Sequence, residues 1–157
     1  MLNYAVARIV EEMPSGVGVP DVAHNVWNVR NLNKIDSYPA ATSSITLNAK
    51  QITLGPGAYE VTGSAPGKEV DLHRIQFFNV SDNQAAIDGT TEWSVEGENT
   101  VTRSFLKGIV VVTGASKVFE LRHMHGNAQN STNGYGLGFP APARPEIYAE
   151  MFIRKIQ

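Results

Sequence analysis

The sequence predicts an all-β sandwich or barrel, and three features support this fold class. Short β-prone segments recur along the chain and are separated by turns rich in Gly, Pro, Asn and Ser, a spacing typical of sandwiches and barrels. No window of about a dozen residues combines a helical apolar period with helix end caps. Residues 109–112 (Ile-Val-Val-Val) are apolar on both strand faces, which predicts a strand covered from both sides.

In the first half of the chain, turn residues separate the expected strands. Pro14-Ser15-Gly16 stops the first β-prone segment, and residues 26–35 then alternate like one half-buried strand. Gly55-Pro56-Gly57 is a strong turn signal, and Pro66-Gly67 is expected to break the chain. The strands expected in this half are residues 3–10, 26–35, 45–47, 51–54 and 58–62.

In the second half, strands are expected to alternate with two longer loops. Residues 92–99 and 126–144 are rich in the Gly, Asn, Ser and Pro that favour turns, so we expect exposed loops at the ends of the sandwich. The strands expected in this half are residues 70–80, 85–87, 100–113, 117–125 and 146–156. Residues 1–157 are therefore predicted to form a single domain.

The composition argues against several classes of function. The 157 residues include no cysteine, which excludes disulfides and thiolate metal sites. The 13 basic and 15 acidic residues give a net charge of −2 without a visible basic cluster, so we expect no nucleic-acid partner. We expect no membrane partner either, because no apolar run is long enough for a span. Residues 1–4 lack the features of a signal peptide, which predicts cytoplasmic synthesis.

The aromatic residues divide into two groups. The simplest interpretation places Trp27, Phe77, Phe105 and Phe119 in the core. Trp93 lies in polar surroundings, where it contacts a ligand, caps a loop or belongs to a seam between chains.

His123 and His125 form the sharpest candidate for chemistry. Two residues apart on a strand, they share a face and are positioned to bind one metal ion, as in the cupin enzymes. The cupin pattern also requires a Glu soon afterwards and a later His, but Gln129 and Asn130 follow here, and no His comes after His125. Two ligands leave a first-row metal under-coordinated. We therefore expect no catalytic residue, metal or cofactor. We expect the two His side chains either to bond the backbone at a strand end or to pair between chains.

The polar stretch around Gly97 offers oxygen ligands. Glu92, Glu96 and Glu98 suit Ca²⁺, but they lack the fixed spacing of a calcium loop. A solvated loop is the favoured interpretation.

The final strand is predicted to have two apolar faces. Because residues on a strand alternate, one face suits the core and the other needs a second cover. The core face carries Ile147, Ala149, Met151 and Ile153. We expect the other face to form a subunit interface, and its residues are Tyr148, Glu150, Phe152, Arg154 and Ile156. The alternative is that residues 13–24 of the same chain cover this face.

Seven segments occur in a characteristic order. They are WNVRNLN at 27–33, ITLGPGAY at 52–59, HRIQFFNV at 73–80, SFLKG at 104–108, VFELRH at 118–123, GLGF at 136–139 and EIYA at 146–149. This order resembles the C1q/TNF-like jelly-roll domains of phage virion proteins, over nearly the whole chain. Gly55 is a departure, because Pro-x-Gly more often follows the Leu directly in that family.

The resemblance implies an all-β jelly-roll sandwich of about ten short antiparallel strands, a homotrimer and no catalytic residues. It also places His123 in a structural Leu-x-His pattern. The function expected first is a non-enzymatic virion structural protein, either a capsid decoration or cement protein or a head spike, bound to other virion proteins. The first residues and loop 12–24 are a candidate attachment arm.

Two alternatives stay open. One is the receptor-binding tip of a phage tail fibre or baseplate, which recognises a host-surface receptor or glycan. Exposed loops would make this contact, or the contact with a neighbouring virion protein in the first role. The expected contact residues in these loops are Glu92, Trp93, Glu96, Asn130, Asn133 and Tyr135. The more distant alternative is a cupin-like metalloenzyme that uses His123 and His125.

Overall fold

A computed structural model describes residues 4–20, 23–39, 44–126, 134–139 and 144–157. Twelve strands and no helix lie in these ranges. The strands are β1 (Val6–Met13), β2 (Asn28–Val29), β3 (Lys34–Tyr38), β4 (Ile45–Asn48), β5 (Gln51–Leu54), β6 (Gly57–Lys68), β7 (Asp71–Asn79), β8 (Gln84–Asp88), β9 (Glu92–Ser94), β10 (Val101–Val112), β11 (Lys117–His125) and β12 (Glu146–Lys155). Nothing in the described ranges is a helix suited to crossing a membrane.

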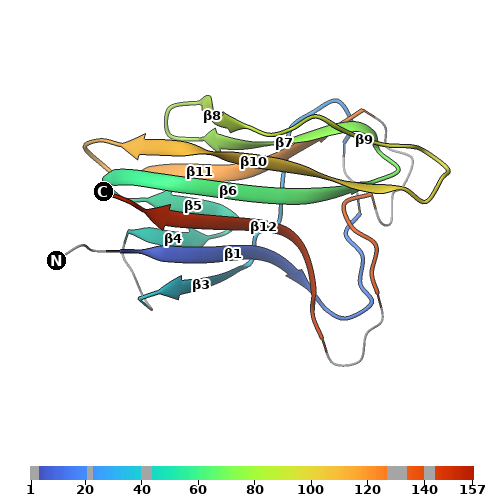
Figure 1. Ribbon diagram of the computed structural model, residues 1–157, viewed down its shortest axis with the longest axis horizontal. Helices are drawn as coiled ribbons and strands as arrows, with labels where there is room; N and C mark the ends of the chain where they lie inside the picture. The colour runs from blue at the N-terminus through green and yellow to red at the C-terminus, as the bar shows by residue number, and fades with distance from the viewer. Residues whose placement is uncertain (1–3, 21–22, 40–43, 127–133, 140–143) are drawn as a thin grey trace.

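The strands form two antiparallel sheets, which confirms the all-β prediction (Figure 1). The first sheet has five strands in the order β10-β6-β12-β1-β3. The second follows the order β4-β5-β11-β7-β8, and β2 pairs with β11 while β9 pairs with β7. Both chain termini lie at one end of this sandwich, which we call the termini end (Figure 1). Residues 14–20 and 134–139 lie at the opposite end, which we call the loop end.

The core at the termini end is apolar, because alternate strand residues from both sheets point inward. Phe77 and Phe119 are fully buried and stack with ring centroids 4.8 Å apart, so their predicted place in the core is confirmed. Ala149, Met151 and Ile153 of β12 are also fully buried, as the alternation predicted.

Residues 26–35 do not form the single strand that their alternation predicted. β2 pairs with β11 of the second sheet, whereas β3 pairs with β1 of the first sheet. The chain therefore crosses from one sheet to the other between these strands, and Arg30 is buried at the crossing. Trp27 is half-buried rather than fully in the core, and the Arg74 guanidinium lies 5.6 Å from its ring centroid.

Pro66-Gly67 does not break the chain either, since both residues belong to β6 and pair with β10. Proline lacks an N–H and is tolerated where a strand has a neighbour on one side only. β12 pairs with β6 only as far as Ser64, so Pro66 occupies such an edge. Gly67 packs against the His73 ring, to whose atoms an added Cβ would approach within 2.9 Å.

The core position predicted for Phe105 is wrong, because this ring is 54% exposed. Its neighbours on the same face of β10, Ile109 and Val111, are also exposed, whereas Val110 and Val112 are buried. The chain thus covers only one of the two apolar faces of residues 109–112. The uncovered face belongs to the outside of the five-stranded sheet.

Candidate functional site

The outer face of the five-stranded sheet carries exposed apolar side chains on two strands. β10 contributes Phe105, Ile109 and Val111, and β12 contributes Phe152 and Ile156 next to its end. The strand register places β6 between them, because both β10 and β12 pair with it. Monomeric proteins seldom leave a large contiguous apolar patch in water. This outer face is therefore the candidate functional site.

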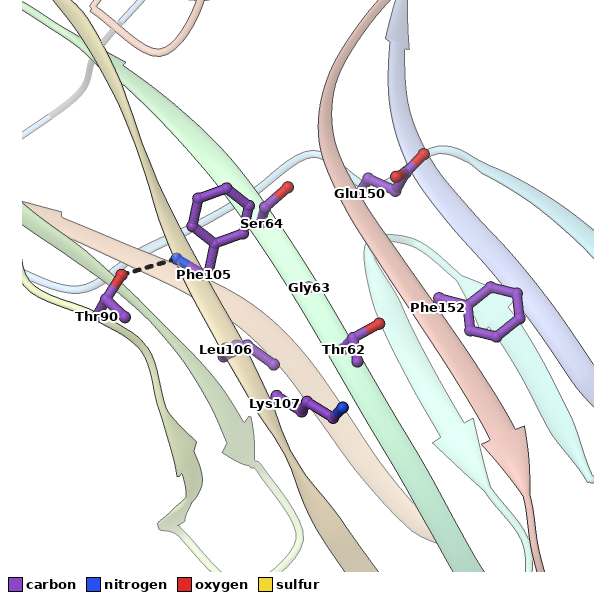
Figure 2. A pocket seen from close by; sticks show the side chains of 9 residues that line it. All are labelled: Thr62, Gly63, Ser64, Thr90, Phe105, Leu106, Lys107, Glu150 and Phe152. Carbon is purple, nitrogen blue, oxygen red and sulfur yellow. Dashed lines mark hydrogen bonds between the residues drawn. The ribbon is translucent and has the colours of Figure 1, made fainter.

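A groove of about 450 Å³ crosses this face between two aromatic rings (Figure 2). Phe105 pairs with Ser64 and Phe152 pairs with Thr62, so the rings stand on opposite sides of β6. The small residues Thr62, Gly63 and Ser64 leave the space between the rings open. The groove is consequently a shallow channel with an aromatic ring on each side, hydroxyl groups along its floor and the charged Lys107 and Glu150 among its lining residues.

The backbone of Phe105 is fixed by a residue outside the five-stranded sheet. Thr90 Oγ1 accepts a hydrogen bond of 3.0 Å from the Phe105 amide, as Figure 2 shows. The Thr90 amide in turn donates to the Phe105 carbonyl at 2.7 Å. These two bonds satisfy the edge of β10 locally and hold the exposed ring in place.

Two ion pairs on this face form within the chain. Arg8 bonds Glu150, and Arg154 bonds Glu60 at 2.6 Å. All four side chains are partly exposed, so the pairs contribute little to stability. Lys107, which lines the groove, is a further exposed charge on this face.

Among the residues expected at a subunit interface, Tyr148 differs from the rest. It is only 6% exposed, and its hydroxyl donates to the Val17 carbonyl at 2.7 Å. Burial raises the pKa of Tyr148 to about 12. At this residue the chain's own loop provides the cover, whereas Phe152 and Ile156 are 45% and 42% exposed.

The described part of loop 12–24 therefore folds back onto the domain, and residues 1–3 lie outside the described residues.

The predicted contact loops are only partly exposed. Trp93 and Glu96 are exposed, and Glu92 is half-buried in the short strand β9. Asn130 and Asn133 lie outside the described residues. The prediction for Tyr135 is wrong, because this side chain is 3% exposed and stacks on His123 with ring centroids 4.4 Å apart.

His123 and His125 are both buried inside the sandwich, and His125 is the last residue of β11, at a strand end as predicted. His123 bonds two side chains, with Nδ1 at 3.2 Å from Arg30 Nη1 and Nε2 at 3.0 Å from His73 Nδ1. A guanidinium beside an imidazole opposes metal binding. Among the residues described, no group of three or more His, Asp or Glu side chains has the arrangement of a metal site.

The partners of His123 could not be read from its own strand. His73 shares a strand face with Ile75 and Phe77, and a histidine on such an apolar face is a signal for a buried polar contact. Arg30, in contrast, carries no comparable signal. It reaches His123 because the chain crosses between the sheets at that residue.

The sequence matches no protein-family model and no curated protein sequence. Solved structures do match. Murine APRIL at pH 8.0 is 8% identical with a TM-score of 0.58, and the alignment covers 98% of this chain and 100% of that one. The globular domain of zebrafish complement 1qA is 13% identical with a TM-score of 0.55, and 98% and 96% of the two chains are covered.

A viral structure has the same degree of similarity. The PRD1 vertex protein P5 is 13% identical with a TM-score of 0.55, and the alignment covers 98% of this chain and 97% of that chain. All three neighbours have C1q/TNF-like jelly-roll folds. The chain therefore has the C1q/TNF-like jelly-roll fold that its sequence predicted.

Proposed function

From this jelly roll, we propose that the chain is a non-enzymatic structural protein of a phage virion and works as a homotrimer. The observation that carries the proposal is the uncovered apolar face with Phe105, Ile109, Val111 and Phe152. The second sheet covers only the inner face of the first, so the outer face needs another cover. A second copy of the chain, with its own apolar side chains, supplies one.

The layout of the face supports a closed ring. A ring uses two different patches of each subunit, one facing each neighbour. The groove between Phe105 and Phe152 is one patch, and Ile109 and Val111, farther along the same face of β10, form another. Filling a groove with apolar side chains from an adjacent copy removes both patches from water.

Within the virion, we propose a capsid decoration, cement or head-spike role, in which a single trimeric domain attaches to other virion proteins. The similarity to a phage vertex protein supports this place. The alternative role as a receptor-binding tip is favoured by one specific feature. Trp93 and Leu72 are cross-strand neighbours and are 62% and 59% exposed, which gives an aromatic platform for a host-surface receptor or glycan.

The oligomeric state tests the proposal. We expect light scattering and sedimentation of the purified chain to give a trimer, and Phe152→Glu to weaken or abolish it. Phe139→Glu is the matched control, because Phe139 is 70% exposed and lies at the loop end, away from the groove. A monomeric wild-type chain, or a trimer of unchanged stability in Phe152→Glu, contradicts the proposal.

The position in the particle tests the role. Antibody labelling of purified virions, followed by electron microscopy, is expected to mark the capsid. Labelling confined to the tail tip supports the receptor-binding alternative instead. A particle without the protein contradicts both.

A further inference from the structure

A chain of four buried or half-buried side chains joins the two sheets at the loop end. Arg30 Nη1 lies 3.2 Å from His123 Nδ1, and His123 Nε2 lies 3.0 Å from His73 Nδ1. His73 Nε2 lies 2.8 Å from the Thr102 hydroxyl oxygen. His123 and His73 belong to the second sheet, and Thr102 belongs to β10 of the first.

The chemistry of arginine fixes the direction of every bond in this chain. A guanidinium has donors only, so His123 Nδ1 must accept the bond from Arg30 and carry no proton. The proton of neutral His123 is then on Nε2, which donates to His73 Nδ1. His73 must likewise carry its proton on Nε2 and donate it to the Thr102 hydroxyl. Both imidazoles are therefore held neutral in a single tautomer.

The carboxylate that binds Arg30 has no capacity for a further positive charge. Glu11 accepts bonds from two nitrogens of Arg30, one of them Nε at 2.9 Å. Its other oxygen accepts the Asn31 amide at 3.1 Å. Glu11 and Arg30 are both buried, so this pair is already neutralised away from water. A proton added to a histidine would be a buried charge that Glu11 does not compensate.

The remaining elements around the two histidines supply little compensation. β6 packs the uncharged Gly67 against His73, and residues 134–139 place the ring of Tyr135 on His123. His125 of β11 lies edge-on to Tyr135 at 5.3 Å between ring centroids, and electrostatically it disfavours a charge on either neighbour. Glu92 of β9 is the one group that favours a charge on His73, and this carboxylate is half-buried.

We propose that this hydrogen-bond chain is an acid-operated lock, in which protonation of His73 or His123 releases residues 134–139 while the termini end stays folded. A proton on His123 Nδ1 points directly at the Arg30 donor. A proton on His73 Nδ1 points at the His123 Nε2 donor. Either way, two donors face each other at a buried site, and for His123 the added positive charge also lies against the Arg30 guanidinium. The molecule relieves this conflict by admitting water at the loop end.

Residues 134–139 are the segment that is released, because the lock holds Tyr135 directly: Arg30 Nη2 donates to the Tyr135 carbonyl at 3.1 Å. The segment is also held by bonds from the Tyr135 amide to the Val19 carbonyl at 3.0 Å, from the Val19 amide to the Gly136 carbonyl at 2.9 Å, from the Lys68 amide to the Gly134 carbonyl at 2.8 Å and from the Phe139 amide to Glu146 Oε1 at 2.9 Å. Tyr135 itself packs on His123, and the Arg30 guanidinium lies 4.4 Å from its ring centroid. When the lock opens, this segment loses its anchor.

The sign of the pH dependence follows from the same burial. Burial lowers the pKa of His73 from 6.5 to about 4, and burial followed by the charge of Arg30 lowers the pKa of His123 well below its usual value. Below about pH 6.5, His73 and His123 therefore bind protons when the loop end is open but remain neutral when it is closed. Stability of the loop end is complete above that pH and is lost as pH falls toward 4. Each titrating histidine changes the opening constant about ten-fold per pH unit in this window.

Two measurements on the wild-type chain test the lock. Nitrogen NMR of histidine-labelled protein is expected to show the Nε2–H tautomer for His73 and His123 at neutral pH. Hydrogen exchange, corrected for intrinsic rates, is expected to show faster opening of the Tyr135 and Val19 amides at about pH 5 than at about pH 7.5. The Ile153 amide in β12 is the internal control and should keep its protection. Equal pH dependence at both ends, or an Nδ1–H tautomer at His123, overturns the proposal.

A variant pair sharpens the test. In His123→Gln, the amide oxygen is able to accept from Arg30 and the amide nitrogen to donate to His73, but the side chain does not titrate. In wild type, each titrating histidine changes the opening constant at Tyr135 by up to about ten-fold per pH unit. We expect His123→Gln to remove the contribution of one histidine from this dependence. His24→Gln is the matched control, because His24 is exposed and should leave the dependence unchanged. An unaltered dependence in His123→Gln overturns the assignment, and the wild-type measurements decide alone if this variant does not fold.

Discussion

The two ends of the sandwich join the same sheets by different physical means. At the termini end, stacked Phe77 and Phe119 and the aliphatic residues around them fill the space between the sheets. At the loop end, Arg30, Glu11 and His123 occupy the equivalent space as a hydrogen-bonded network. An apolar core contains no group that titrates, and it tolerates substitutions that conserve its volume better than those that change it. A buried polar network is stable only when every donor has an acceptor and every charge a partner.

This difference assigns separate tasks to the two ends. The termini end supplies the stability that the hydrophobic effect gives without directional requirements. The loop end adds little net stability, because the cost of burying Arg30 and Glu11 offsets their attraction. What it adds is a fixed position for the chain where it crosses between the sheets and a fixed anchor for residues 134–139. The predictions below compare the ends by removing one group at a time.

The largest effect is expected from Phe119→Ala at the termini end. Removal of a fully buried ring leaves a cavity and should lower the free energy of unfolding by about 3–5 kcal/mol. The loss should be the same at about pH 5 and about pH 7.5, because no titratable group is disturbed. Urea unfolding at both pH values measures it. A loss that depends on pH would show that the two ends are not separate.

Glu11→Gln is expected to cost about 3 kcal/mol at the loop end, because it leaves the Arg30 charge buried without a counter-charge. The amide keeps nearly the same shape, so the loss reports charge rather than packing. Glu12→Gln is the matched control next to it. Its partner Lys34 is on the surface, where solvent screens the pair, so the expected loss is only a small fraction of that in Glu11→Gln. Equal losses in the two variants would contradict a buried ion pair.

Thr102→Val should lower the free energy of unfolding by about 1–3 kcal/mol, because His73 Nε2–H loses its acceptor while the volume is kept. Thr46→Val on the exposed side of β4 should stay within about 0.5 kcal/mol of wild type. Both are measured by urea unfolding at neutral pH. A neutral Thr102→Val would mean that His73 donates elsewhere, against the bond direction that Arg30 imposes.

The sequence predicted the termini end better than the loop end, and the reason is the range of the interactions. The two-residue period of β12 is local, so it correctly placed Ala149, Met151 and Ile153 inside. The exposure of Phe105 was missed because alternation tells which residues share a face, but not whether that face is covered. The network was missed because His123 meets Arg30 and His73 across separations of 93 and 50 residues. Loop composition likewise predicts turns and cannot reveal that Tyr135 stacks on His123.

The smallest effect compares one hydroxyl at each end, through Tyr135→Phe and Tyr59→Phe. Tyr135 donates to the His123 carbonyl at 3.2 Å and accepts from Asn28 Nδ2 at 3.2 Å, whereas Tyr59 donates to the Gly55 carbonyl at 2.9 Å. Each variant keeps its ring and its packing, so each should lose only about 0.5–1.5 kcal/mol at neutral pH.

Their pH behaviour is expected to differ. Tyr135→Phe weakens the anchor of residues 134–139, so hydrogen exchange at the Tyr135 position should speed up further as pH falls below about 6.5. Tyr59→Phe lies at the end without histidines and should show a constant loss across the same range. If both hydroxyl deletions behave alike, the acid sensitivity belongs to the whole fold. If only Tyr135→Phe responds to pH, the loop end opens as a separate unit. The termini end would stay closed because its stacked Phe77 and Phe119 have no group that binds a proton.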